Sequence, residues 1–255
     1  MNEEERWGNY RLANARFPGA RKIELMKQLE KTDPQKGETI VEVGTGTGYL
    51  TFELAKAVGK TGKVLTFDYQ QSNTDYVNKN KGNLNIEAFH QDVDYNLPLA
   101  DNSVDKVSAI ATLHHYDDRS LKTGMKGRKR IVSEFYRVLR KGGRVVIGDV
   151  AKNTTAQRHF DAIDNPIYCA PRGHPHDFLD KKSAIELFQE AGFKKIHFEI
   201  DSTPWIFKDE KEAQTFLHTI HNAKCSPEES LKIAKEHLLF RITKRGFELG
   251  WELFF

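Results

Sequence analysis

The sequence predicts an α/β fold with a mostly parallel, doubly wound sheet. Two observations predict it. Short apolar runs rich in β-branched residues alternate with segments of helical period, and a glycine-rich loop follows the first apolar run. Such loops lie at the carboxyl edge of parallel sheets, where α/β proteins bind ligands. The 255 residues suffice for one substantial core, so we expect a single domain over residues 1–255.

The composition favours a cytosolic globular protein. The formal charge is +3 and the isoelectric point about 8.7, which is compatible with an anionic substrate or RNA and argues for neither. No segment approaches the roughly 18 continuous apolar residues that a membrane span needs. The first residues have no apolar signal-peptide core, and Cys169 and Cys225 lack the spacing of a zinc site. We therefore expect a cytoplasmic protein with no bound metal.

Five strands are predicted in the first part of the chain. They are Thr39–Val43, Lys63–Phe67, Asn85–Phe89, Lys106–Ile110 and Arg144–Val150. Between the first two strands, residues 49–59 carry apolar residues at every fourth position and end in glycine, which predicts a helix. A second helix is predicted over 129–143, because an apolar stripe runs up to a pair of glycines.

The last part of the chain changes pattern. A helix over 181–193 leads into a sixth strand over 194–200, and two helical segments follow at 209–222 and 226–240. The second of these opens with Ser-Pro-Glu-Glu, a typical helix start. A terminal strand is predicted over 247–255.

Two segments are expected to extend this domain. Residues 1–36 are expected to form an N-terminal helical cap. Residues 205–243 form a helical insertion between the last two strands, and they leave the predicted sheet at its ligand-binding edge. The insertion is therefore either a lid over the substrate or a packing or dimer surface.

The glycine loop, VEVGTGTGYL, indicates the ligand class. Gly44, Gly46 and Gly48 follow a strand and open a helix, whereas a dinucleotide fingerprint would need its third glycine where Tyr49 stands. The Gly-Lys-Ser/Thr of a phosphate P-loop is absent. Glu42 would repel a pyrophosphate and favour a ligand with a positive charge. S-adenosylmethionine (SAM) is such a ligand, because it carries an ammonium and a sulfonium and no phosphate.

Two further carboxylates support an adenosine ligand. Asp68 ends the second strand, 20 residues after the last glycine, where an acid accepts hydrogen bonds from ribose hydroxyls. NAD-binding proteins share this feature, so Asp68 does not choose between the two ligands. Asp92, just past the third strand, is a candidate acceptor for the adenine amino group; a plain loop acid is the alternative.

With these motifs in order from about Ile23 to Phe198, the chain resembles the class I SAM-dependent methyltransferases, and most of all the small-molecule group related to ubiquinone and menaquinone methyltransferases. The resemblance implies a Rossmann-like, seven-stranded sheet with a reversed last strand. It also implies SAM as the cofactor and a cytoplasmic methyltransferase. The residues that it implies as cofactor-binding are Glu42, Gly44, Thr45, Gly46, Gly48, Asp68, Tyr69, Asp92, Val93 and Leu113.

His114 and His115 follow the fourth strand, beside the position expected for the methyl group. Histidine titrates near neutrality, so either residue could act as the general base, and we favour His114 as the catalytic residue. The alternative is that these histidines form a cofactor wall with no proton transfer. The stretch TLHHYDD differs from the sequence that quinone methyltransferases usually carry, which argues against a quinone acceptor.

The acceptor is expected to be a small molecule methylated on oxygen, nitrogen or carbon. The loop Tyr168–Asp177 is a candidate acceptor wall, and its histidines match no metal-ligand spacing. The basic run 121–130 and TLHHYDD also resemble methyltransferases that complete wobble-uridine modifications in transfer RNA, so nucleic acid is the alternative substrate. A non-catalytic SAM-binding protein is a further alternative. We expect a monomer or a homodimer.

Overall fold

The computed structural model describes residues 3–91, 96–116, 125–163, 167–169 and 177–255. The chain forms two compact units, each assembled from separate stretches of sequence. The first unit contains residues 1–24, 150–178 and 200–253, and the second contains residues 25–149, 179–199 and 254–255.

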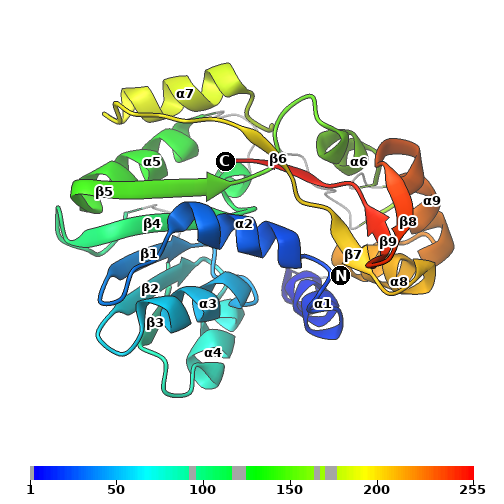
Figure 1. The fold of residues 1–255 in the computed structure, drawn as a ribbon, viewed down its shortest axis with the longest axis horizontal. Helices are drawn as coiled ribbons and strands as arrows, with labels where there is room; N and C mark the ends of the chain where they lie inside the picture. The colour runs from blue at the N-terminus through cyan, green and yellow to red at the C-terminus, as the bar shows by residue number, and fades with distance from the viewer. Residues whose placement is uncertain (1–2, 92–95, 117–124, 164–166, 170–176) are drawn as a thin grey trace. The chain divides into compact units, whose positions relative to one another are not determined.

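The second unit is built around a parallel sheet with the strand order β3-β2-β1-β4-β5 (Figure 1). Its strands are β1 (Thr39–Val43), β2 (Lys63–Asp68), β3 (Ile86–His90), β4 (Val104–Ile110) and β5 (Leu139–Gly148). The accompanying helices are α2 (Lys22–Thr32, which begins in the first unit), α3 (Tyr49–Val58), α4 (Gln71–Asn80), α5 (Lys126–Val138) and α7 (Lys181–Glu190). The predicted α/β fold with a mostly parallel sheet is confirmed.

The central strands are buried because neighbouring strands and helices cover them. Every residue of β4 is buried, as are the last four of β1. β1 (TIVEV) and β4 (VDKVSAI) are rich in β-branched residues, which is why the sequence predicted them as strands. Gln28 of α2 fastens this helix to the sheet, since its amide donates to the Ser108 hydroxyl at 2.7 Å and to the Val146 carbonyl at 3.1 Å.

The seven-stranded sheet implied by the resemblance does not appear as such. The described part of the second unit has five paired strands, and a single antiparallel bridge between Asp149 and Phe254 prolongs them. The predicted strand over 194–200 is wrong, because only Ile200 enters β6 (Ile200–Ser202). Most of this segment is exposed, and Glu199 exchanges two backbone hydrogen bonds with Phe255 alone.

The predicted terminal strand is divided in two. Its first half is β9 (Gly246–Leu249), between β7 (Trp205–Phe207) and β8 (Phe240–Thr243), and its second half is β10 (Glu252–Phe254), paired with β6. Gly250 separates the halves; its N–H donates to the Leu239 carbonyl at 2.6 Å, and a Cβ there would lie 3.2 Å from that oxygen. The two halves therefore pair with different strands.

The boundary between α5 and β5 also differs from the prediction. The helix ends at Val138, before the glycine pair, and β5 begins at once with Leu139. Gly142 has φ +85°, and a Cβ on Gly143 would lie 2.8 Å from the Asp105 carbonyl oxygen. The two glycines thus shape an irregularity in the pairing of β4 with β5, rather than ending a helix.

The first unit is mainly helical, with α1 (Glu3–Arg16), α6 (Thr155–Ile163), α8 (Glu210–Ile220) and α9 (Pro227–His237). The two helices predicted between residues 205 and 243 are confirmed as α8 and α9. Asp209 and Ser226 cap their N-termini by accepting backbone N–H groups three residues ahead. Trp205 stacks on Trp251 at a ring distance of 4.1 Å, which places aromatic rings in the core of this unit.

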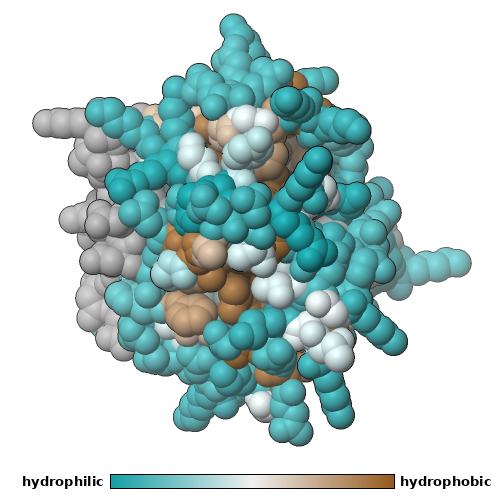
Figure 2. Space-filling model, turned by 90° about the vertical axis from the view of Figure 1, so that its left-hand side faces the viewer, coloured by the Kyte–Doolittle hydropathy of each residue, from teal (hydrophilic) through white to brown (hydrophobic). Residues whose placement is uncertain are grey.

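The molecular surface is largely polar where Figure 2 shows it. Hydrophilic residues surround a smaller hydrophobic area on that face. Within the described ranges, no helix combines the length and the apolar composition needed to cross a bilayer.

Candidate active site

The glycine loop joins β1 to α3 and depends on left-handed glycines. The φ angles of Gly44, Gly46 and Gly48 are +86°, +50° and +76°, a region that residues with a Cβ rarely adopt. A Cβ on Gly44 would also lie 2.1 Å from the hydroxyl oxygen of Thr112. The loop therefore packs directly against the turn that follows β4, and glycine is required at the contact.

Asp68, the last residue of β2, holds the loop by hydrogen bonds. Its carboxylate accepts the backbone N–H groups of Gly46 and Gln70, each at 2.8 Å, and the side-chain amide of Asn73 at 3.1 Å. The residue is 7 % exposed. The structure thus brings Asp68 and the glycine loop together.

Glu42 is buried inside the second unit. Its carboxyl group accepts hydrogen bonds from the hydroxyls of Thr51 in α3 and Thr66 in β2, the latter at 2.8 Å. Thr66 also shares a hydrogen bond of 2.7 Å with Thr45 of the loop. Burial raises the pKa of Glu42 to about 8, although the two hydroxyls oppose the rise and the nearby Asp68 adds to it. Burial therefore favours the protonated form of Glu42.

The turn after β4 presents Leu113 and His114. Ala111 has φ +50°, a left-handed conformation that costs free energy in a residue with a Cβ, and its N–H donates to the Gly148 carbonyl at 2.7 Å. The chain then enters η1 (Leu113–Tyr116), with Leu113 and His114 buried. This strained turn, which follows the carboxyl end of β4, contacts the glycine loop through Thr112 and Gly44.

His114 forms a pair with Asp149. The imidazole Nδ1 lies 2.6 Å from one carboxylate oxygen of Asp149, and the backbone N–H of His114 donates to the other at 3.0 Å. The side chains are 5 % and 2 % exposed. β4 and β5 are parallel neighbours, so the residues just beyond them meet at one edge of the sheet. This His–Asp pair is suited to proton transfer.

Asp149 was not predicted from the sequence. It stands after Gly148 in the apolar run RVVIGDV, where a single acid has no distinctive spacing. The available signal was its place at the carboxyl end of the strand that pairs with the one leading to His114.

The basic run is partly structural where the structure describes it, in residues 125–130. Arg128 is fully buried, and its guanidinium lies 3.5 Å from the carbonyl oxygen of His114. Lys129 pairs with Glu190 of α7 at 2.6 Å. Because Arg128 is enclosed by the protein, it does not belong to a phosphate-binding surface.

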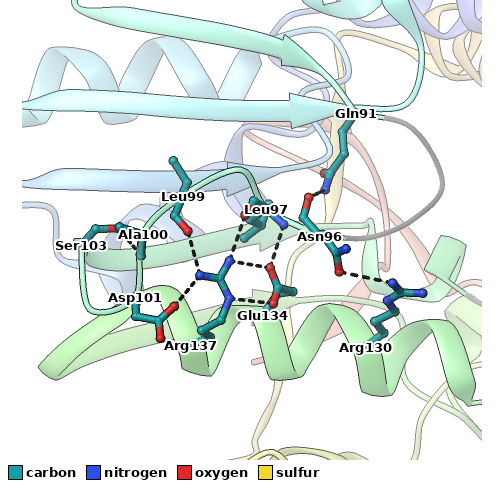
Figure 3. Close-up of polar contacts among 10 residues, drawn as sticks. All are labelled: Gln91, Asn96, Leu97, Leu99, Ala100, Asp101, Ser103, Arg130, Glu134 and Arg137. Atoms are coloured by element: carbon teal, nitrogen blue, oxygen red, sulfur yellow. Dashed lines mark hydrogen bonds and ion pairs between the residues drawn. The ribbon is translucent and has the colours of Figure 1, made fainter.

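Arg137 anchors the chain that precedes β4 to α5 (Figure 3). Its guanidinium donates to the carbonyls of Leu97 and Leu99 at 2.9 and 2.7 Å, and it pairs with Asp101 and Glu134 at 2.7 Å each. Glu134 also accepts the N–H of Leu97 at 2.8 Å. The hydrogen bond from Arg137 lowers the pKa of Glu134. The network fixes the start of the strand that leads to His114.

Some candidate residues cannot be placed. Asp92 and Val93 lie outside the described residues, as does most of the loop Tyr168–Asp177. At its described end, Asp177 pairs with Lys152 at 3.3 Å. Among the residues that the structure does describe, no group of three histidine, cysteine or acidic side chains could hold a metal ion.

Part of the chain matches a known protein family. Residues 41–147 match the family model described as a methyltransferase domain. This region contains the glycine loop, Asp68 and His114. This match and the relatives below support a class I SAM-dependent methyltransferase. Its cofactor is S-adenosyl-L-methionine.

Similar proteins carry related names. The chain is 28 % identical over 187 residues to the demethylmenaquinone methyltransferase of Oceanobacillus iheyensis, covering 66 % of this chain and 74 % of that protein. It is 25 % identical over 183 residues to the ubiquinone/menaquinone biosynthesis C-methyltransferase UbiE of Klebsiella pneumoniae, covering 64 % and 69 %. A solved SAM-dependent methyltransferase from Aquifex aeolicus has a TM-score of 0.51 and 24 % identity, covering 68 % and 81 %, and supports the fold.

The residues of this methyltransferase fit the cofactor. The carboxylate of Asp68 is an acceptor suited to ribose hydroxyls and lies at the loop. The hydroxyl of Thr47, in the middle of the loop, is buried, and the described residues give it no hydrogen-bond partner. The loop from Gly44 to Gly48 carries no lysine or arginine, in keeping with a ligand without phosphates.

Proposed function

We propose that this methyltransferase acts on a small molecule that loses a proton during the reaction, with His114 as the general base. One observation carries the proposal. The turn that holds His114 packs against the glycine loop, through Thr112 and Gly44, and Asp149 holds the imidazole. A base beside the cofactor loop can take the proton of an acceptor that is about to receive the methyl group.

Each residue has a chemical task in this proposal. When bound, SAM supplies a methyl group activated by the sulfonium charge. Asp68 and the loop hold the cofactor. His114 accepts the proton of an O–H or N–H bond, and the electron pair of that bond stays on the acceptor atom, which becomes the nucleophile. The imidazolium then faces a carboxylate oxygen of Asp149 at 2.6 Å, and its charge is stabilised there.

The relatives support a small-molecule acceptor. The names of two of them refer to demethylmenaquinone and to ubiquinone or menaquinone. Quinones in their reduced form carry ring hydroxyls, the kind of proton source that a base requires. Since TLHHYDD departs from the usual quinone pattern, we propose the wider class of hydroxylated or amine-bearing small molecules.

The acceptor side of the site remains our proposal from the sequence. Residues 205–243 and Tyr168–Asp177 are proposed to contact the acceptor. Backbone hydrogen exchange measured with and without acceptor tests this, because contact should slow exchange in α8 or α9. Unchanged exchange in both helices would contradict it.

Transfer of a labelled methyl group tests the proposed function. The protein is incubated with methyl-labelled SAM and a cell extract that has been separated into small-molecule, RNA and protein fractions. We expect label in the small-molecule fraction. Label in transfer RNA instead, falling when Lys126, Lys129 and Arg130 are neutralised together, would overturn the proposal and favour the nucleic-acid alternative. SAM binding with no transfer to any fraction would favour a non-catalytic SAM-binding protein.

A further inference from the structure

We propose that Asp149 is the positioning residue that fixes His114 in the Nδ1–H tautomer, and that the pair thereby selects acceptors that arrive with a removable proton on oxygen or nitrogen. This inference rests on the proposed function, because it assigns a role within the same site. It adds a residue that the sequence did not indicate and narrows the class of acceptor.

The geometry is a two-point clamp on one residue. One oxygen of Asp149 lies 2.6 Å from the imidazole Nδ1 of His114, and the other accepts the backbone N–H of the same residue at 3.0 Å. A single hydrogen bond would leave the imidazole free to swing about its side-chain bonds. Two contacts from one carboxylate fix the ring relative to its own main chain.

The clamp also determines which ring nitrogen can act. An ionised carboxylate only accepts hydrogen bonds, so the nitrogen that faces it must carry the hydrogen. A neutral imidazole has one N–H, which places its lone pair on Nε2. In this tautomer, Nε2 is the ring nitrogen that can accept a proton.

The surroundings hold both members of the clamp. The main chain of Asp149 is fixed on both sides, because its N–H donates to the Phe254 carbonyl at 3.1 Å and its carbonyl accepts the Phe254 N–H at 2.8 Å. The buried guanidinium of Arg128 lies 3.5 Å from the carbonyl oxygen of His114. These contacts fix the two main chains from which the clamp is built.

A general base at this position favours an acceptor that carries a removable proton. Proton transfer to Nε2 breaks an O–H or N–H bond of the acceptor and leaves its electron pair on the atom that is methylated. A phenol, an alcohol or a protonated amine benefits from this step. A thioether or an unprotonated tertiary amine has no removable proton, so a base at His114 cannot assist its methylation.

The substitution Asp149→Asn tests the clamp because it reverses the tautomer. Asparagine has one oxygen and one amide nitrogen in nearly the same shape. The backbone N–H of His114 can only donate, so the oxygen must face it and the amide N–H must face Nδ1. Nδ1 then has to accept, the hydrogen moves to Nε2, and the base is lost although the side chains still fit.

Two readouts follow from this reversal. In ¹⁵N spectra of histidine-labelled protein, we expect His114 to carry its hydrogen on Nδ1 in the wild type and on Nε2 in Asp149→Asn. Methyl transfer at saturating SAM, with the small-molecule extract fraction as acceptor source, should fall by about 100-fold or more, the usual contribution of a general base. SAM affinity by calorimetry should stay within about threefold, since cofactor contacts are unaltered.

Matched variants separate positioning from folding. Asp75→Asn changes an exposed aspartate of α4 instead, and it should leave transfer unchanged. His114→Gln should lose as much activity as Asp149→Asn, and the double variant should lose no more, because the two residues act as one unit.

The outcomes distinguish this inference from the proposed function. A wild-type His114 with its hydrogen on Nε2 would overturn the clamp, and this measurement needs neither a folded variant nor an acceptor. Near-wild-type transfer by Asp149→Asn would also overturn it while leaving small-molecule methylation intact. Label that appears only in RNA would instead refute the proposed function.

Discussion

At the scale of single residues, Glu42 shows how burial changes the meaning of a motif. The sequence predicted a carboxylate that favours a cationic ligand. The structure places the group among Thr51 and Thr66, where burial raises its pKa to about 8. A favourable charge interaction with SAM therefore requires Glu42 to release a proton.

The raised pKa of Glu42 predicts that the affinity for SAM depends on pH. If SAM stabilises the ionised form, its affinity rises with pH up to about 8 and binding releases protons. Calorimetry in two buffers of different ionisation enthalpy measures that release, and Glu42→Gln should abolish it. An identical proton release in the glutamine variant would show that Glu42 does not ionise on binding.

Replacement of Asp68 is expected to lower the affinity for SAM. Asp68→Ala removes the acceptor proposed for the ribose and the hydrogen bond to the loop at Gly46. SAM affinity should fall by roughly tenfold or more, the cost of losing hydrogen bonds to a charged group. Titration calorimetry measures it, with the exposed Asp75→Asn on α4 as the control. An unchanged affinity would remove Asp68 from the site.

At the scale of elements, the side chain of Arg137 attaches the segment that precedes β4 to helix α5. Arg137→Met should lower the free energy of unfolding by about 1–3 kcal/mol, because it leaves two carbonyls and the Glu134 carboxylate without this donor. Urea unfolding followed by circular dichroism measures the change. Arg130→Met on the same helix is the control, since its one hydrogen bond within the described residues, to Asn96, is 3.4 Å long. Equal losses in both variants would contradict the anchoring role.

The elements also show what the sequence can and cannot predict. β1, β2 and β4 were predicted to within about two residues, because each contains a short run rich in β-branched residues. The glycine pair at 142–143 was misread, since glycine ends helices and also permits irregular strand pairing. The division of 247–255 between β9 and β10 depends on strands far away in sequence, which no local pattern reveals.

The sequence indicated those residues of the candidate site that occur at a recognisable spacing. The glycine loop, Asp68 and His114 stand at positions that a strand-loop-helix pattern marks. Asp149 has no such pattern, because its role arises only when the ends of β4 and β5 meet.

At the scale of the whole molecule, the two units should respond to pH in opposite directions. In the first unit, burial and then the neighbouring His221 and His237 hold the pKa of His159 well below its usual value. The folded state then binds fewer protons than the unfolded state, so stability is lost as pH falls below about 6.5. In the second unit, the raised pKa of Glu42 makes stability fall as pH rises from 4.5 towards about 8.

Hydrogen exchange resolves the two effects. After correction for intrinsic rates, α6 and α8 should exchange faster at about pH 5.5 than at neutral pH, and β1 and α3 faster at about pH 8.5. His159→Phe should remove the acid effect, whereas His197→Gln, at an exposed histidine, should not. Uniform changes across both units would contradict the assignment.

The most direct test of the central claim is methyl transfer by wild type and His114→Gln, side by side, from labelled SAM to the small-molecule fraction of a cell extract. We expect label in that fraction with the wild type and a loss of about 100-fold or more with His114→Gln, at unchanged SAM affinity. Equal transfer by the two proteins, or label found only in RNA, would contradict the account.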